Sequence, residues 1–232
     1  MEQANQYIKV GMAFIDAISR LDENKPEYVS QIFDILNCIH PDYGYHMGIY
    51  IEEPSDYEAA THACDQSWFH CYQGIEEPIM RQPYNPTKWR DGNNDNMLYL
   101  RFTFEMFQHM NIEKSTMGAW QVYLLCVSKT LLPFSGGLYY TKRQLILTQE
   151  QAHNIRPFWR WKSIPELENL SEDVSPNIVI KDNQATVSCC YWNDWEGLIR
   201  EHVTISFTGN GKVEIGNFLH DTIIKYCCRI KF

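Results

Sequence analysis

Histidine and cysteine gather in one short segment of the chain, where metal binding is the chemistry to consider. His62, Cys64, His70 and Cys71 are of the types that coordinate zinc. Zinc ligands usually come as close C-x-x-C or H-x-x-x-H pairs, and neither spacing occurs in this segment. If the segment is helical, the cysteines share one face and the histidines another, roughly 160–200° away. We therefore expect core or half-buried side chains, with no metal and no cofactor.

Two adjacent cysteine pairs, Cys189-Cys190 and Cys227-Cys228, each fall in a predicted strand. Neighbouring strand residues point to opposite faces, so one thiol of each pair should face the core. The other should face solvent or a covering helix. A soft metal site or a redox pair is the functional alternative, but small apolar filling is the interpretation that we favour.

A turn rich in tryptophan and acid, residues 191–197, joins two of the predicted C-terminal strands. It contains Trp192, Asp194, Trp195 and Glu196. The structural interpretation is a capped hairpin whose indole rings pack on the sheet. The functional interpretation is a partner-binding surface, because tryptophan is enriched at interface hot spots. These four residues are therefore partner-binding candidates.

Signatures of common enzymes are missing from the sequence. It has no G-x-S-x-G elbow, no Walker loop, no GxGxxG and no H-E-x-x-H. Glu201 with His202, or Asp194 with Glu196, would supply an acid–base pair, but solvent-facing charge explains both spacings. No catalytic residue is assigned. An enzyme of an unrecognised family, with a site built from dispersed His, Cys and carboxylate residues, is the alternative.

Acidic residues are concentrated at the start of the chain. Residues 1–78 hold 14 acidic and 3 basic residues, whereas residues 79–165 hold 5 acidic and 11 basic residues, and the whole chain has a net charge of −9. Nucleic-acid binding needs a basic face, so we expect no nucleic-acid partner. A basic protein partner would be attracted to the N-terminal part. We expect its contacts on the N-terminal helices and at Glu52, Glu53, Asp56 and Glu58.

The N-terminal two thirds of the chain predict helices first and a mixed arrangement after them. The opening residues carry acid and amide groups between their apolar positions, which indicates an amphipathic helix and not a signal peptide. We expect helices over about 3–21, 26–39 and 119–129, a helix that begins in the capping box at 55–58, and a short helix from 148. Strands are expected over 44–52, 97–107 and 138–147, with a surface loop over 74–96 and a turn at 133–137.

β-Branched alternation marks the C-terminal third as an antiparallel meander. Strands are expected over 178–180, 185–192, 202–207, 212–215 and 222–232, with Asn210-Gly211 as the hairpin turn. Helices before and strands after indicate the α+β class, with an N-terminal helical hairpin and a mixed middle region. We expect a single domain over 1–232, with a subdivision near 78–96 as the alternative.

Three functions fit these observations. The first is a cytoplasmic binding protein without catalysis of its own, of the immunity type, which neutralises a basic toxin or effector by direct contact. The second is the enzyme described above. The third is a homo-oligomeric structural or regulatory subunit that uses its tryptophan-rich segments. No apolar run is long enough to cross a membrane, so we expect no membrane partner.

Overall fold

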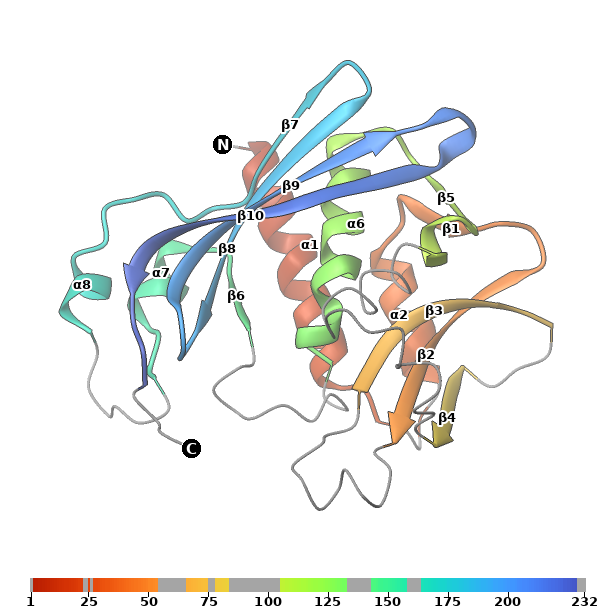
Figure 1. Ribbon diagram of the computed structural model, residues 1–232, viewed down its shortest axis with the longest axis horizontal. Coiled ribbons are helices and arrows are strands. Elements are labelled where there is room, and N and C mark those ends of the chain that lie inside the picture. The colour runs from red at the N-terminus through yellow and green to blue at the C-terminus, as the bar shows by residue number, and fades with distance from the viewer. Residues whose placement is uncertain are drawn as a thin grey trace, which may run out of the picture.

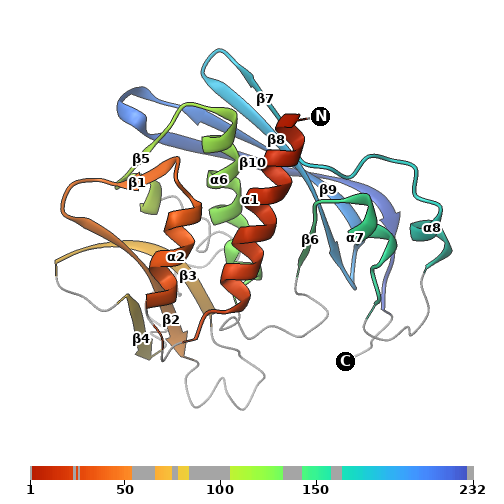
Figure 2. The ribbon, with the colours of Figure 1, turned by 180° about the vertical axis from the view of Figure 1, so that it is seen from behind.

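The fold is α+β, with helices at the N-terminus and an antiparallel meander at the C-terminus. The computed structural model describes residues 2–22, 25, 27–53, 66–74, 78–83, 105–132, 143–157 and 164–228. The helices α1 (Glu2–Ser19) and α2 (Glu27–Ile35) run side by side as a hairpin (Figures 1 and 2). Their apolar stripes face inward and their polar residues face solvent, as the 3.6-residue period predicts.

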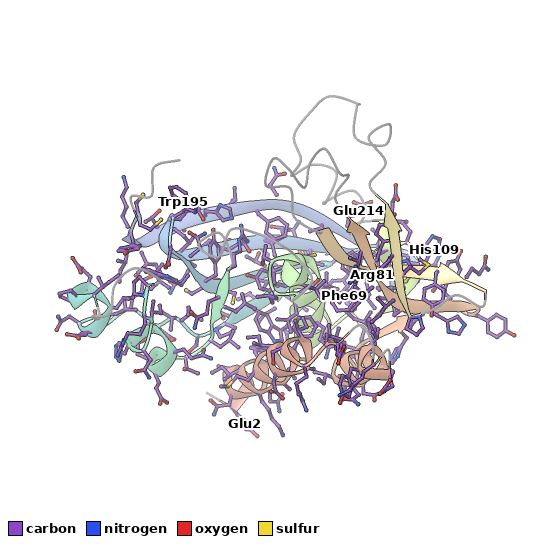
Figure 3. The ribbon with its side chains drawn as sticks, turned by 90° about the horizontal axis from the view of Figure 1, so that it is seen from below. Glu2, Phe69, Arg81, His109, Trp195 and Glu214 are labelled. Carbon is purple, nitrogen blue, oxygen red and sulfur yellow. The ribbon has the colours of Figure 1, made fainter. Side chains whose placement is uncertain are left out.

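A third helix, α6 (Thr116–Val127), lies at the centre of the molecule. Figure 3 views it end-on, with α1 and α2 on one side and the C-terminal sheet on the other. Every residue from Gly118 to Val127 is buried, which explains why this helix is apolar all round and has no polar face. The Trp120 indole donates a hydrogen bond to the backbone oxygen of Tyr7, 3.0 Å away, and so fixes α6 against α1.

The C-terminal sheet runs in the order β10-β9-β8-β6, with β7 pairing to β8. Its pairs are all antiparallel. One face packs on α6, and one end of the other face is covered by two short helices, which enclose a second, smaller core. The bounds are β6 (Gln144–Ile146), α7 (Gln149–His153), α8 (Pro165–Glu168), β7 (Asn177–Lys181), β8 (Gln184–Asn193), β9 (Gly197–Phe207) and β10 (Val213–Lys225).

Two smaller sheets lie beside α2. In the first, β2 (Tyr45–Glu53) pairs with β3 (Gln66–Gln73) antiparallel and with β4 (Ile79–Pro83) parallel. In the second, β1 (Ile39–Pro41) pairs with β5 (Met110–Ile112). Inside the core, the Gln121 side chain of α6 accepts a hydrogen bond from the Cys38 backbone N–H at 2.8 Å, which holds the turn between α2 and β1.

Several predicted elements are confirmed. Both N-terminal helices, the strand at 44–52, the central helix and the short helix after Thr148 are present. Ser115 and Thr148 accept hydrogen bonds from backbone N–H groups of the helices that they precede, as cap residues do. The described part of the predicted strand 138–147 is β6. The expected helix at 55–58 and the turn at 133–137 lie outside the described residues.

Other predictions were wrong in part, mostly where long-range pairing decided the structure. The segment around His70, which the sequence left open between a helix and another structure, is strand β3, and the expected 74–96 loop contains β4. Residues 105–107 are helical and not a strand end, and the second helix stops at Ile35 because residues 39–41 pair with β5. The last two predicted strands are one strand, β10, which ends at Lys225, before Cys227.

No helix within the described ranges combines the length and the apolar character that a membrane crossing needs.

Candidate functional site

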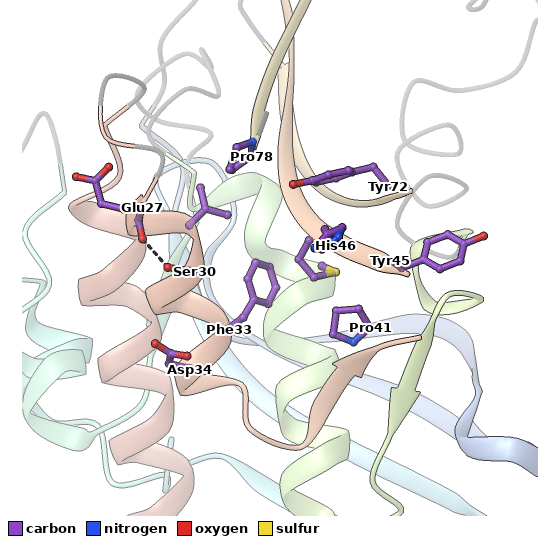
Figure 4. A pocket seen from close by; sticks show the side chains of 11 residues that line it. Glu27, Ser30, Phe33, Asp34, Pro41, Tyr45, His46, Tyr72 and Pro78 are labelled. Carbon is purple, nitrogen blue, oxygen red and sulfur yellow. Dashed lines mark hydrogen bonds between the residues drawn. The ribbon is translucent and has the colours of Figure 1, made fainter. Parts of the chain in front are cut away.

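A pocket of about 560 Å³ opens between α2 and the beginning of β2 (Figure 4). Phe33 projects from α2 into it, and Glu27 and Asp34 stand at the two ends of the same helix. Its volume falls in the range of roughly 300–1,000 Å³ that is usual for small-ligand sites. The lining residues are Glu27, Val29, Ser30, Phe33, Asp34, Pro41, Tyr45, His46, Met47, Tyr72 and Pro78.

Negative charge dominates this pocket. Glu27 and Asp34 lie seven residues apart on α2, so they share one face of the helix at a separation of about 10 Å along its axis. Both are exposed, and neither carboxylate forms an ion pair with any described residue. The described lining contains no lysine and no arginine. The carboxylates are therefore not neutralised from within the described chain.

Aromatic rings form much of the wall, and contacts within the chain hold them. The Phe33 ring meets Phe69 edge-on, at a centroid distance of 5.6 Å. The Tyr45 ring stacks on His109 at 4.3 Å, which ties the start of β2 to the segment before β5. Tyr72 lies beside His46, with centroids 5.6 Å apart. Such preformed aromatic surfaces suit a flat or cationic ligand.

The pocket lies on the N-terminal helical hairpin, where partner contacts were expected, but its acidic residues differ from those that the sequence named. Glu52 and Glu53 lie at the end of β2, whereas the pocket lies at its beginning, about 17 Å away along the strand from Met47 to Glu52. Asp56 and Glu58 lie outside the described residues. The signal present in the sequence was the seven-residue spacing of Glu27 and Asp34, which places both on one face of a helix. That these two residues line a pocket depends on β2 and β3, which lie opposite the helix.

His70 and Cys71 do not converge on a common site. They are neighbours in β3 and point to opposite faces of the sheet. The Cys71 sulfur lies 3.0 Å from the sulfur of Met47, and burial, followed by the charge of Asp42, raises the pKa of its thiol to about 12. His62 and Cys64 lie outside the described residues. Within the described part of the chain, no three His, Cys, Asp or Glu side chains are placed to hold a metal.

His70 is instead a half-buried residue with a buried ring nitrogen. Its ring lies near Tyr50 and Tyr72, with centroids at 6.2 and 5.3 Å. Its Nε2 is buried and has no hydrogen-bond partner among the described residues. Burial lowers the pKa of His70 to about 4, so the ring is neutral near pH 7.

The tryptophan-rich turn is a tightly hydrogen-bonded hairpin end. The Trp192 indole donates to the Asp194 carboxylate at 2.7 Å, and both side chains are buried. The Asn193 side-chain oxygen accepts hydrogen bonds from the backbone N–H groups of Trp195 and Glu196, at 3.0 and 2.7 Å. Of the four candidates, Trp195 is half-buried and Glu196 exposed, so these two carry the surface of the turn.

A second constellation surrounds Glu201 in β9, and the expectation that its charge faces solvent was wrong. This carboxylate is fully buried, at 0% exposure. One of its oxygens accepts a hydrogen bond from the Tyr123 hydroxyl at 3.1 Å. The other lies 2.9 Å from the guanidinium of Arg143 and 2.7 Å from Nε2 of His220. Arg143 in turn lies over the Tyr191 ring, 4.2 Å from its centroid.

The electrostatics of this cluster keep Glu201 ionised. Burial alone would raise the pKa of its carboxyl group, but the hydrogen bond from His220 and the charge of Arg143 outweigh it, so the pKa lies below its usual value. Glu201 is sealed from solvent, and three side chains of the described chain surround its carboxylate. His220, with 40% of its side chain exposed, and Arg143, with 24%, are the members of the cluster that solvent reaches.

Adjacency in the sequence paired Glu201 with the wrong histidine. His202 points to the opposite face of β9, where its Nε2 lies 3.1 Å from Asp221. The partner of Glu201 is His220, which is its register neighbour in β10. The period-2 alternation of a strand was the signal that would have excluded His202, but only the strand pairing reveals His220.

The cysteine pairs differ from each other. Cys189 and Cys190 are both buried, on opposite faces of β8, and they belong to the two separate cores. Burial raises the pKa of each thiol, which makes both poor nucleophiles. Cys227 is exposed and Cys228 half-buried, and both lie beyond the end of β10, so the expectation that one of them faces the core from a strand was wrong. The seven described cysteines carry free thiols.

No family model, no curated protein and no solved structure matches this chain.

Proposed function

We propose that this chain is a binding protein without catalysis of its own, of the immunity type, which neutralises a basic toxin or effector protein by direct contact. The observation that carries the proposal is the pocket beside α2, in which two exposed carboxylates have no cationic partner among the described residues. It lies in the acidic part of the chain, residues 1–78, where 14 acidic residues face only 3 basic ones. The proposal includes a cytoplasmic location.

Physical reasons favour a basic protein as the partner. Complementary charge accelerates diffusional encounter and disfavours partners of the same sign. A pocket with aromatic walls can bury an anchoring side chain, and such anchors dominate the energy of interfaces. The Glu201 cluster gives weaker support to an enzyme, because its carboxylate is sealed and three hydrogen-bond partners within the chain already occupy it.

The decisive experiment captures the partner and measures how it binds. The tagged chain is incubated with a lysate of its native cell, and the captured protein is purified and assayed with and without the chain. We expect a basic protein whose own activity is inhibited and whose association rate falls as salt is added. An acidic partner, an uninhibited one, or no partner would contradict the proposal.

Matched charge reversals locate the contact. Glu27→Lys with Asp34→Lys should slow association and weaken its salt dependence. Glu166→Lys with Glu214→Lys makes the same change in net charge at exposed positions on α8 and β10. This control should leave the association rate nearly unchanged. Equal effects of both pairs would mean that only the overall charge matters.

The acidic segment named by the sequence is tested in the same way. Reversal of Glu52, Glu53, Asp56 and Glu58 should also slow association if the partner extends beyond the pocket. Light scattering on the isolated chain tests the third function, a homo-oligomeric subunit. A stable dimer that forms without any partner would favour that alternative.

A further inference from the structure

We propose that the pocket beside α2 receives an arginine side chain of the protein partner. This inference rests on the proposed function and specifies the chemistry of its anchor. It follows from three properties of the pocket, which are its carboxylates without an ion-pair partner among the described residues, its aromatic walls and its shape.

The carboxylates select for positive charge. Glu27 and Asp34 are exposed at the pocket and form no ion pair with the described residues. Their separation of about 10 Å along α2 is too large for one cation to contact both. One guanidinium therefore pairs with one carboxylate, and a second basic residue of the partner meets the other. With a neutral or anionic side chain in the pocket, both carboxylates would be enclosed in the interface without a positive charge to balance them.

The aromatic wall distinguishes arginine from lysine. Phe33 projects into the pocket, and Tyr72 and His46 line the opposite side. A guanidinium is planar and weakly hydrated, and it stacks on aromatic faces while its edge donates two parallel hydrogen bonds to a carboxylate. The lysine ammonium is compact and strongly hydrated, so it gains less from such a wall.

The size and rigidity of the pocket agree with a side-chain anchor. A volume of about 560 Å³ accommodates one long side chain together with some of its adjoining backbone. Val29 and Met47 are buried beneath it as part of the core, and the stacking of Tyr45 on His109 holds one wall in place. A wall that is already ordered loses little conformational entropy on binding.

The test uses short peptides and not the unidentified partner. The peptide acetyl-Gly-Arg-Gly-amide is titrated into the labelled full chain and followed by NMR. Two matched peptides carry citrulline or lysine in place of arginine, and arginine amide serves as the free small molecule. We expect the arginine peptide to shift the resonances of Phe33 and Tyr72. The citrulline peptide, which lacks the charge, should bind roughly tenfold more weakly.

Neutral variants connect the binding to the two carboxylates. Glu27→Gln and Asp34→Asn change exposed side chains, so both variants should fold. Together they should reduce the affinity for the arginine peptide roughly tenfold. Glu166→Gln is the control and should have no effect. Equal binding of the arginine and citrulline peptides, shifts confined to residues outside the pocket, or no shifts at all would overturn the inference.

The outcomes also separate this inference from the proposed function. If no arginine peptide binds, yet the reversals at Glu27 and Asp34 still slow association with a basic partner, the anchor is wrong and the acidic interface is supported. If arginine amide binds more tightly than the peptide, the pocket is a small-molecule site, and the docking of a protein side chain is refuted. Tighter binding of the lysine peptide would refute arginine as the anchor.

Discussion

Glu201 and His220 face each other across strands β9 and β10, with Oε2 of the carboxylate 2.7 Å from Nε2 of the imidazole. The carboxylate is sealed from solvent, whereas the histidine reaches the surface. Arg143 and Tyr123 complete the set of partners around the carboxylate. A buried charge is tolerated only while its partners remain in place. The stability of the fold should therefore depend strongly on each member of this cluster.

Removing the carboxylate should destabilise the protein strongly. Glu201→Ala leaves the guanidinium of Arg143 largely enclosed without its counter-charge, and it leaves the Tyr123 hydroxyl without its acceptor. We expect the free energy of unfolding to fall by about 3–5 kcal/mol, as measured by urea denaturation followed by tryptophan fluorescence.

An exposed glutamate provides the comparison for this variant. Glu214→Ala in β10 removes the same type of side chain from the surface. Its effect should stay within about 0.5 kcal/mol. A similar small effect for Glu201→Ala would mean that the cluster contributes little to stability.

His70 should make the protein less stable in mild acid. Its pKa is lowered from 6.5 to about 4 in the folded state because the ring is buried, so between these values the unfolded chain binds more protons than the folded chain. Stability from this residue is therefore complete above about pH 6.5 and declines as the pH falls towards 4. In His70→Gln, this part of the pH dependence should disappear from urea denaturation curves recorded across that range.

A surface histidine tests whether the effect belongs to burial. His40→Gln replaces an exposed ring in β1 and is the surface control for the loss of an imidazole. If His70→Gln and the parent protein lose stability equally between pH 6.5 and 4, the ring is not the group responsible.

Gly211 allows the β9–β10 turn to approach β5 closely. It has a φ of +72°, and a Cβ at this position would clash with the Asn111 side-chain oxygen. Gly211→Ala should therefore lower the free energy of unfolding by at least about 1–2 kcal/mol, the cost of left-handed backbone for a residue with a side chain. Gly209→Ala is the control in the same turn, since a Cβ there would have no described atom within 4 Å. Thermal unfolding of the two variants side by side measures the difference, and equal midpoints would contradict the argument.

Local patterns in the sequence determined the helices and most of the meander. Helix α6 begins where Ser115 accepts from the Gly118 N–H at 3.0 Å, and α7 begins at the capping box of Thr148 and Gln151. Such signals involve residues within four positions of each other, so one sequence is enough to find them. Alternating β-branched residues located β8 and β9 for the same reason. The α+β class followed from the order of these elements.

Tertiary structure alone decided the candidate sites. Strand β3 exists because residues 66–73 pair with β2, and β4 joins β2 in parallel, so their formation depends on which segments meet. The same holds for the pairing of Glu201 with His220, and for a pocket whose walls come from α2, β2 and β3. The sequence determined that acidic charge lies in the N-terminal part. Only packing decided which two carboxylates stand beside an aromatic wall, because the register and docking of distant strands are set by long-range contacts that local spacing does not encode.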